Sequence, residues 1–245
     1  MALNIIILAG GKGTRIKSVL KDTPKIMATI AGKPFLDWLL VWIDSWKLEI
    51  PKKILLSTCV GHNKIKNYCD ERNLDVYCIP EQKPLGTFGA LANVASTNKS
   101  NEYLVLNGDT IFKANFKKIY QIFKHNIKTK PLLILKESLE NSRYGGYEQI
   151  DSGWLFAQKN TNFISLGSFF ITYEDLKERW ILSTNVPFDK EQINNIDQEL
   201  MVDSHLFGKF PISAEILECN TPFIDIGIPT SLKQAQFYIP KIVKN

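Results

Sequence analysis

The stretch Ile5-Ile6-Ile7-Leu8-Ala9-Gly10-Gly11-Lys12-Gly13-Thr14-Arg15 joins an unbroken apolar run to a glycine-rich turn. A continuous run of branched aliphatic residues is typical of a β-strand whose two faces are both buried, as in a parallel sheet. Glycines at the carboxyl end of such a strand let the backbone turn sharply and bring its N–H groups close to a ligand. Open α/β sheets bind ligands at this edge, so the stretch predicts a parallel sheet with a ligand site at residues 10–15.

Short apolar runs and longer helical patterns alternate outward from this stretch through the first half of the chain. The predicted strands cover 54–58, 76–79, 103–106 and 132–135, and the predicted helices cover 34–46, 62–73, 87–96 and 115–125. This alternation predicts an α/β fold: a doubly wound, mostly parallel, Rossmann-like sheet in three αβα layers.

The pattern changes after about residue 140. Asp151-Ser152-Gly153 lies between two short apolar runs, 146–150 and 154–158, which together indicate a β-hairpin. Further elements are predicted as strands over 163–172 and 214–217 and helices over 193–206 and 231–238. We therefore expect an antiparallel β insertion or lid in the C-terminal half. It would belong to a single domain over 1–245, divided into halves 1–135 and 136–245.

The composition is that of an ordinary globular chain. Of the 245 residues, 44% are apolar and 22% are charged, and the net charge is +5. This balance argues against a largely disordered chain. The lysines are scattered without a block of five, so no nucleic-acid partner is expected. The histidines and cysteines match no zinc-ligand spacing.

The sequence shows no targeting or membrane segment. The N-terminus has no basic region before its apolar run, and the longest apolar stretch, 35–43, is about half a membrane span. We therefore expect a soluble protein of the cytoplasm with no membrane partner.

Arg15 gives the glycine-rich turn a preference for anions, because its guanidinium fork matches phosphate oxygens. The turn is not a GxxxxGK[ST] loop, and it is not GxGxxG because Ile16 stands at the last position. A glycine-rich turn alone is often only structural. Together with Arg15 and the later Pro24-Lys25 pair, it predicts phosphate binding.

Two carboxylates are candidate metal ligands, Asp109 at the end of a predicted strand and Asp225 within an apolar one. Asp109, in Asn107-Gly108-Asp109-Thr110, can hold a divalent cation against phosphate oxygens, and its structural alternative is an Asx turn. Asp225 lies between apolar residues in Phe223-Ile224-Asp225-Ile226-Gly227, where a carboxylate needs a partner; its alternative role is helix capping. A fourth segment, Pro84-Leu85-Gly86-Thr87-Phe88-Gly89-Ala90-Leu91, passes from a glycine-bearing loop into a helix whose first amides can read a base edge.

These segments together resemble the sugar-phosphate nucleotidylyltransferases, the NDP-sugar pyrophosphorylase family. The matching motifs, in order along nearly the whole chain, are Leu8–Arg15, Pro24-Lys25, Gly32-Lys33-Pro34, Pro84–Thr87, Asn107–Thr110 and Phe223–Pro229. Within the family the chain looks most like the bacterial D-glycero-α-D-manno-heptose 1-phosphate guanylyltransferases. Four places depart from the family pattern: Ile26, Gln158, Ser165-Leu166-Gly167 and Ile228. The departures cluster among residues expected to contact the sugar, so the identity of the sugar is not decided by the resemblance.

The resemblance implies roles for the matched positions. Arg15 and Lys25 would neutralise the triphosphate, and Asp109 and Asp225 would hold Mg²⁺, so these four form the expected catalytic set. The nucleotide would be bound by Leu8, Ala9, Gly10, Gly11, Gly13, Thr14, Gly86, Thr87 and Gly108. The sugar phosphate would be bound by Tyr144, Gly145 and Lys159.

The expected reaction is attack of a sugar 1-phosphate on the α-phosphorus of a nucleoside triphosphate, with release of pyrophosphate. The resemblance favours GTP and the heptose phosphate, for surface polysaccharide synthesis. Mannose 1-phosphate with GTP, glucose 1-phosphate with dTTP or UTP, and CTP with a non-sugar phosphate stay open. A glycosyltransferase and a non-catalytic nucleotide sensor are the distant alternatives. The oligomeric state is also open: most of Trp38, Trp42 and Trp180 are expected in the core, and any that is exposed would mark a homodimer face.

Overall fold

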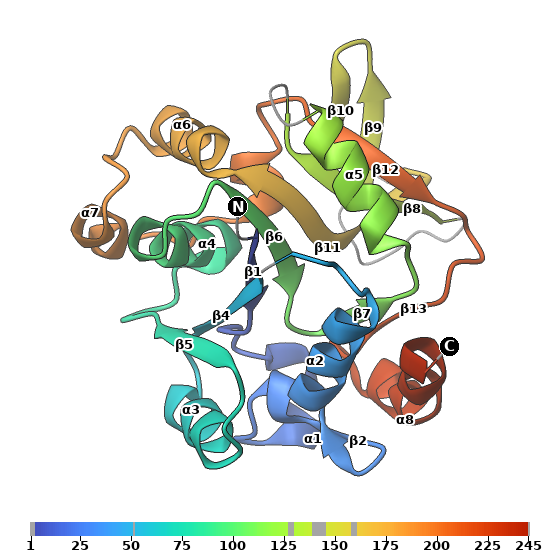
Figure 1. Cartoon of the computed structure of the whole chain (residues 1–245). Helices are drawn as coiled ribbons and strands as arrows, with labels where there is room; N and C mark the ends of the chain where they lie inside the picture. The colour runs from blue at the N-terminus through green and yellow to red at the C-terminus, as the bar shows by residue number, and fades with distance from the viewer. Residues whose placement is uncertain (1–2, 51, 127–129, 139–145, 158–160, 245) are drawn as a thin grey trace.

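A nine-stranded sheet forms the centre of the molecule (Figure 1). The computed structural model describes residues 3–50, 52–126, 130–138, 146–157 and 161–244. The strand order is β10-β9-β11-β6-β1-β4-β5, with β8 beside β11 and β12 beside β8. The strands are β1 (Leu3–Leu8), β4 (Lys52–Thr58), β5 (Val76–Pro80), β6 (Glu102–Asn107), β8 (Leu132–Glu137), β9 (Gly146–Ile150), β10 (Gly153–Ala157), β11 (Phe163–Thr172) and β12 (Ser213–Leu217).

The first half of the chain supplies the parallel part of the sheet. β1 pairs in parallel with β4 on one side and β6 on the other, and β4 pairs in parallel with β5. β11 then pairs antiparallel with β6, β8 and β9, and the β9–β10 pair is the hairpin expected at Asp151-Ser152-Gly153. The mostly parallel α/β sheet with an antiparallel addition is thus confirmed.

Helices cover both faces of the sheet (Figure 1). The side chains of β1 show why: Ile5 and Ile7 enter one apolar core while Ile6 enters the other, and all three are fully buried. Residues from α2, α3, α5 and α8 share the first core, and residues from α4, α6 and α7 share the second. The helices are α1 (Lys17–Leu20), α2 (Phe35–Ser45), α3 (His62–Glu71), α4 (Gly86–Thr97), α5 (Phe116–Asn126), α6 (Tyr173–Thr184), α7 (Lys190–Asn195) and α8 (Pro229–Lys244).

Two short strand pairs complete the described structure. β7 (Thr110–Phe112) pairs antiparallel with β13 (Phe223–Asp225), and β2 (Thr29–Ile30) pairs with β3 (Lys33–Pro34). The β7–β13 pair joins segments that lie more than a hundred residues apart in the sequence, so it places the Asp109 region beside the Asp225 region.

The helix predicted over 193–206 is wrong. The structure has α7, then an extended segment over residues 196–201, which we call the strap, and then a π-helical turn, η3 (Val202–Leu206). Leu200 in the strap forms two backbone hydrogen bonds, donating to Leu85 at 2.8 Å and accepting from Phe88 at 2.8 Å. These tertiary bonds replace the hydrogen bonds that a continuous helix would make.

The three tryptophans considered for a homodimer face are all core residues, as expected for most of them. Trp38, Trp42 and Trp180 are 4%, 3% and 0% exposed, and Trp42 Nε1 donates to the carbonyl of Phe112 at 2.9 Å. They therefore offer no surface to a second copy.

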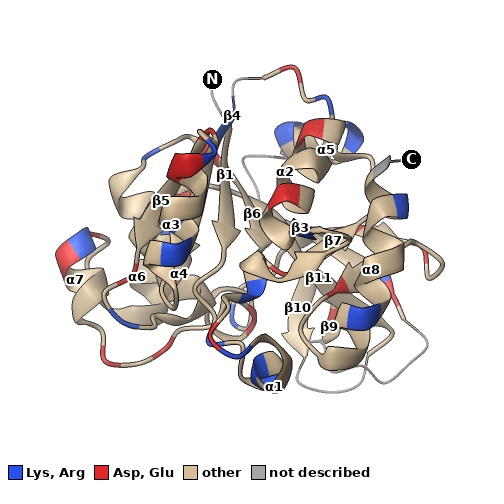
Figure 2. Cartoon of the chain, turned by 90° about the horizontal axis from the view of Figure 1, so that it is seen from below, with Lys and Arg blue, Asp and Glu red and all other residues tan. Residues whose placement is uncertain are grey.

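None of the helices in the described ranges combines the length and apolarity needed to cross a membrane. In the view of Figure 2, both basic and acidic residues are spread over several helices and loops.

Candidate active site

The carboxyl ends of β1 and β6 bring two loops together. Gly108 N–H donates to the carbonyl of Leu8 at 2.9 Å, which ties the loop after β6 to the end of β1. A Cβ at position 108 would lie 2.7 Å from that carbonyl oxygen, so the approach depends on glycine. On the other side, Ala9 N–H donates to Ser57 of β4 at 2.9 Å. The glycine-rich loop thus starts from a point fixed on both sides.

A cavity of about 230 Å³ opens above these strand ends, and we call it the nucleotide cavity. It is lined by Leu8, Ala9, Gly10, Gly11, Lys12, Lys25, Ile26, Glu81, Pro84, Gly86, Thr87, Ala90, Asn107, Gly108, Asp109, Glu199 and Met201. Seven of the nine residues predicted to bind nucleotide are therefore brought together. The other two, Gly13 and Thr14, lie at the start of the next helical turn and do not line this cavity.

A second cavity of about 110 Å³ adjoins the first, since both are lined by Asn107 and Asp109. We call it the acceptor cavity. Its lining residues are Arg15, Asn107, Asp109, Thr110, Ser165, Leu166, Gly167, Phe223 and Asp225. The structure therefore places both predicted metal carboxylates and Arg15 around one small space.

The backbone fixes the two carboxylates relative to each other. Asp225 pairs with Thr110 across the β7–β13 ladder, and Ile226 N–H donates to the carbonyl of Asp109 at 2.9 Å. Asp225 is 7% exposed, and its Oδ1 accepts from Gly227 N–H at 2.8 Å. The Asp225 side chain thus forms an Asx turn with Gly227, before α8 begins at Pro229, and also lines the acceptor cavity.

Lys25 sits beside one of these carboxylates. Its Nζ lies 2.8 Å from Asp109 Oδ2, and both side chains are about four-fifths buried. Thr110 Oγ1 donates to the other oxygen, Oδ1, at 3.0 Å. Lys25 lines the nucleotide cavity, and Asp109 lines both cavities, so the positive charge of Lys25 lies at the boundary between the two cavities.

The turn before α4 closes the far side of the nucleotide cavity. Gly86 has φ +74°, and a Cβ there would lie 2.4 Å from the carbonyl oxygen of Leu200 in the strap. Thr87 Oγ1 accepts from Val202 N–H at 2.9 Å. The strap is therefore held against this turn, and it contributes Glu199 and Met201 to the cavity wall.

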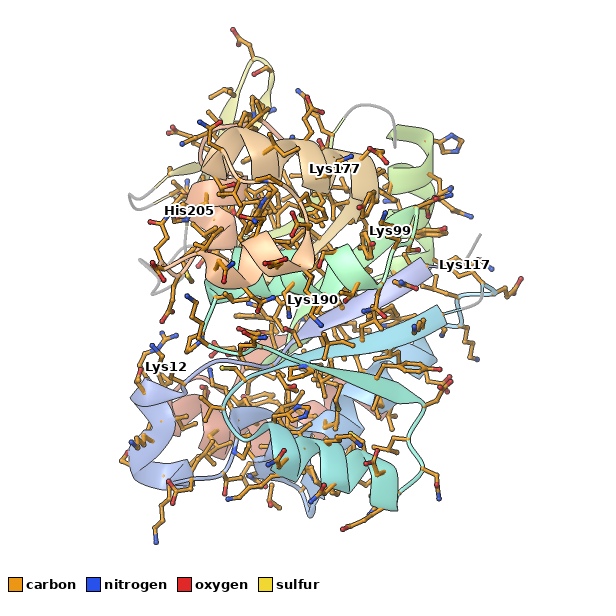
Figure 3. The ribbon with its side chains drawn as sticks, turned by 90° about the vertical axis from the view of Figure 1, so that its left-hand side faces the viewer. Lys12, Lys99, Lys117, Lys177, Lys190 and His205 are labelled. Atoms are coloured by element: carbon orange, nitrogen blue, oxygen red, sulfur yellow. The ribbon has the colours of Figure 1, made fainter. Side chains whose placement is uncertain are left out.

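Three wall residues, Glu81, Glu199 and Met201, lie outside every motif singled out in the sequence, and Lys12 lies within the glycine-rich turn without an assigned role. Lys12 Nζ and Glu199 Oε1 form an ion pair of 2.7 Å that joins the glycine-rich loop to the strap. Figure 3 shows Lys12 and His205, the latter in η3 just after the strap, on the same side of the molecule. No local sequence pattern marks the strap residues Glu199 and Met201, because the strap reaches the cavity through tertiary contacts.

Glu81 is a buried carboxylate in the wall of the nucleotide cavity. Its oxygens accept from Ser57 Oγ at 3.1 Å and from Leu85 N–H at 3.2 Å. Burial raises the pKa of Glu81, and the nearby charge of Glu199 raises this pKa further, whereas the two hydrogen bonds lower it. Glu81 therefore anchors the loop that carries Gly86.

The donor set at the cavity boundary fits a hard divalent cation. Asp109 and Asp225 offer carboxylate oxygens around one space, and Mg²⁺ is usually held by one or two carboxylates together with substrate phosphates. Within the described ranges, no group of three or more His, Cys, Asp or Glu side chains could form an all-protein metal cage. The site therefore suits a cation that arrives with a phosphorylated ligand.

Tyr144, Gly145 and Lys159, the residues predicted to bind the sugar phosphate, lie outside the described residues. The described part of the acceptor side is the bulged region of β11. Its register shifts between Ser165 and Phe169, and Ser165, Leu166 and Gly167 line the acceptor cavity there.

Comparisons with known proteins agree with this geometry. Residues 4–159 match the nucleotidyl transferase family. The chain is 32% identical over 235 residues to the D-glycero-α-D-manno-heptose 1-phosphate guanylyltransferase of Campylobacter jejuni, covering 93% of this chain and 96% of that protein. It is 29% identical over 241 residues to the Aneurinibacillus thermoaerophilus protein of the same name, covering 96% and 97%.

A solved structure extends the likeness to three dimensions. HddC from Yersinia pseudotuberculosis, crystallised in complex with GMP-PN, superimposes with a TM-score of 0.72 at 26% identity, covering 95% of this chain and 97% of that one. A putative glucose-1-phosphate thymidylyltransferase from Bacillus anthracis shares the fold at 15% identity and a TM-score of 0.72. From the matched family pattern and the relatives that it resembles over nearly its full length, this chain belongs to the nucleotidyl transferase family.

Proposed function

We propose that this protein transfers a guanylyl group from GTP to D-glycero-α-D-manno-heptose 1-phosphate. A phosphate oxygen of the sugar 1-phosphate attacks the α-phosphorus, the bond to the leaving phosphate breaks, and GDP-heptose and pyrophosphate result. One observation carries the reaction class: Asp109 and Asp225 line one cavity with Arg15, directly beside the cavity built on the glycine-rich loop. The choice of guanine and heptose rests on the names of the relatives matched over more than nine-tenths of this chain.

The main obstacle to this reaction is electrostatic, because both reactants are polyanions. Lys25 and Arg15 supply positive charge at the junction of the two cavities. Preorganised charges of this kind stabilise the charge that develops in transfer. The sugar phosphate is already ionised and needs no general base. In keeping with this, no histidine is among the described residues that line either cavity.

Positioning of the two reactants would lower the activation free energy further. The α-phosphate must sit at the boundary that Asn107 and Asp109 share, so that the acceptor approaches from the side of Asp225. Holding two reactants in line contributes on the order of 7–11 kcal/mol at best. The backbone bonds that join β1, β6, β7 and β13 would hold the side chains that set this geometry.

Asp109 and Asp225 would hold Mg²⁺ in this proposal. When bound, the ion neutralises phosphate charge and orients the phosphate oxygens. Lys25, now paired with Asp109, would be free to contact phosphate in the loaded site.

The remaining sequence predictions complete the proposal. Tyr144, Gly145 and Lys159 would contact the sugar phosphate. The chain would act as one domain, residues 1–135 binding the nucleotide and 136–245 the sugar phosphate, within the cytoplasm.

The decisive experiment is a grid of pyrophosphate-release assays with Mg²⁺. GTP, CTP, UTP, dTTP and ATP are each combined with the heptose 1-phosphate, mannose 1-phosphate and glucose 1-phosphate. We expect one dominant combination, GTP with the heptose phosphate. A different dominant combination would keep the reaction and refute this substrate pair. Absence of release from every combination, with nucleotide still bound, would refute the reaction and favour a sensor.

A further inference from the structure

Tyr147 and Asp203 form a buried hydrogen bond between the two sides of the site. Tyr147 is fully buried, and its Oη donates to Asp203 Oδ1 at 2.5 Å. Burial raises the pKa of Asp203, although the tyrosine hydrogen bond lowers it. Burial, and then the adjacent carboxylate, raise the pKa of Tyr147. The tyrosine therefore stays protonated as the donor. Among the described residues, Tyr147 is the hydrogen-bond partner that the structure gives this carboxylate.

The Asp203 end of the bond belongs to the nucleotide side. Asp203 lies in η3, two residues after Met201, which lines the nucleotide cavity. Between them, Val202 N–H donates to Thr87 Oγ1 at 2.9 Å. These contacts fix the backbone of this segment without using the Asp203 carboxylate. A π-helical turn is rare and occurs frequently at functional sites.

The Tyr147 end belongs to the acceptor side. Tyr147 is the second residue of β9, and within the part of the chain that the structure describes, β9 is registered with β11 at Gly146 opposite Ile164. The next residue along β11, Ser165, lines the acceptor cavity. The opposite part of the hairpin is held elsewhere, by the Trp154 pairing with Ile212. Two bonds to side chains hold the hairpin end that lies next to the acceptor cavity: Tyr147 N–H donates to Thr161 Oγ1 at 3.0 Å, and the Tyr147 hydroxyl donates to Asp203. Of these two bonds, the one from the hydroxyl reaches the nucleotide side.

We propose that Tyr147 and Asp203 are positioning residues for the sugar 1-phosphate, holding the start of β9 at a fixed place relative to the nucleotide cavity. The inference rests on the proposed function, since it needs an acceptor that reacts across the two cavities. Loss of the hydroxyl leaves a buried carboxylate without its donor, and such groups are expensive to leave unpaired. The hairpin end then moves, and the protein binds the sugar 1-phosphate more weakly. The wall of the nucleotide cavity keeps its backbone hydrogen bonds, so the affinity for GTP is unchanged.

The chain contains a matched control for this pair. Tyr120 Oη donates to Glu102 Oε2 at 2.8 Å, and Glu102 is 1% exposed, whereas Tyr120 is partly buried and Lys124 Nζ also pairs with Glu102. Glu102 opens β6, whereas Asn107 at the other end of the same strand lines both cavities. At about 3.3 Å per residue the two positions are roughly 17 Å apart. Tyr120→Phe therefore removes a tyrosine hydroxyl from a buried carboxylate away from the site, and Lys124 still pairs with that carboxylate. It controls for the loss of a hydroxyl-to-carboxylate hydrogen bond as such.

The test compares Tyr147→Phe with Tyr120→Phe in steady-state pyrophosphate release. Sugar phosphate is varied at saturating GTP, and GTP is varied at saturating sugar phosphate. For Tyr147→Phe we expect the KM for sugar phosphate to rise roughly tenfold, equivalent to about 1.4 kcal/mol, with the KM for GTP within twofold of wild type. For Tyr120→Phe we expect neither KM to change by more than twofold.

A second pair of variants separates positioning from general packing. Asp203→Asn keeps an oxygen that accepts from Tyr147, so the sugar-phosphate KM should stay close to wild type. Asp203→Leu removes every acceptor and should match Tyr147→Phe. Equal changes in both KM values, or identical effects of Tyr147→Phe and Tyr120→Phe, would overturn the inference. An inactive wild-type protein would instead refute the proposed function, so the two failures are distinguishable.

Discussion

Asp109 belongs to both cavities, and its contacts explain why a carboxylate is needed there. One oxygen faces Lys25 and the other accepts from Thr110, while its carbonyl holds Ile226 beside Asp225. The Asp109 side chain thus supplies a negative charge, and its backbone carbonyl fixes the position of Asp225 through Ile226. A substitution that keeps the shape and removes the charge separates these two contributions.

Asp109→Asn and Asp225→Asn should each reduce turnover on the order of 10²-fold or more, which is what the loss of one preorganised electrostatic group usually costs. In Asp225→Asn the amide oxygen can still accept from Gly227 N–H, so the fold should persist. Pyrophosphate release at saturating substrates measures the effect. The control is Asp70→Asn on exposed α3, which should keep wild-type turnover. Turnover within threefold of wild type in both site variants would remove these carboxylates from the catalytic set.

Gly108→Ala should destabilise the protein, because the new Cβ would meet backbone atoms of Leu8 that cannot rotate away. Overpacking of this kind costs typically about 1–3 kcal/mol. Gly11→Ala is the matched variant: no atom lies within 4 Å of its Cβ position, so stability should stay the same or rise slightly. Urea denaturation of both variants gives the comparison. Equal free energies of unfolding would show that the close approach of the two loops is not tight.

Glu81 should make stability depend on pH in a defined direction. Its folded pKa lies above the unfolded value, so the folded state binds more protons between those two values. Its contribution is therefore most favourable below about pH 4.3, the unfolded value, and is lost as the pH rises through the folded pKa. Glu81→Gln removes this titration. The stability of the variant relative to wild type should increase from pH 4 to pH 7, as measured by thermal unfolding. A constant difference would contradict the raised pKa.

At the scale of elements, sequence reasoning succeeded where local pattern and burial agree. The apolar run at Ile5–Leu8 correctly predicted the central strand β1, because helices cover both faces of this strand and both faces therefore favour apolar side chains. The strand Phe163–Thr172 was predicted with its observed bounds. It failed between residues 193 and 206, where the backbone of Leu200 bonds to Leu85 and Phe88. The helix α6 was also not predicted, although Thr172 caps it by accepting from Asp175 N–H.

The candidate site divides in the same way. The glycine-rich turn with Arg15, and Asp109, follow β1 and β6, and parallel strands bring their carboxyl ends to one edge, so these residues were found from the sequence. Asp225 was found because it is a carboxylate between apolar residues. Glu81 and the strap residue Glu199 have no such mark. Their place in the nucleotide cavity depends on how far-apart segments fold against each other.

The strap should be displaced by Gly86→Ala, because position 86 has φ +74° and a Cβ would meet the carbonyl of Leu200 at 2.4 Å. We expect a tenfold or larger rise in the KM for GTP, and a loss of stability of about 1–3 kcal/mol. Gly32→Ala is the matched control, since Gly32 also has a positive φ of +80° but nothing within 4 Å. It should lose stability through backbone strain alone and keep the KM. Equal KM values in the two variants would exclude a role for the strap in nucleotide binding.

At the scale of the whole molecule, one sheet carries both halves of the chain. β11 from the second half pairs along five registered positions with β6 from the first. The tryptophans sample both sides of this sheet, with Trp38, Trp42 and Trp46 in one core and Trp154 and Trp180 in the other. They therefore report whether the two faces unfold together.

We expect one cooperative unfolding transition. Variants that keep only Trp42 or only Trp180 should show the same urea midpoint by fluorescence as the far-ultraviolet circular dichroism signal. GTP with Mg²⁺ at 100 times its Kd should stabilise the whole protein by about 2.7 kcal/mol, and both probes should move together. Separate midpoints for the two tryptophans would divide the chain into independent folding units.

The hairpin of β9 and β10 lies at the outer end of the strand order and is joined to the remaining sheet by few contacts. The turn of such a hairpin, at residues 151–153, can be lengthened or shortened during evolution, while Tyr147 and Trp154 stay in the second core. The strands that carry the nucleotide loops have no such freedom, because each is paired on both sides or packed under helices. Mutations that change the choice of sugar should therefore accumulate at the rim of this fold, while the chemistry at its centre is inherited unchanged.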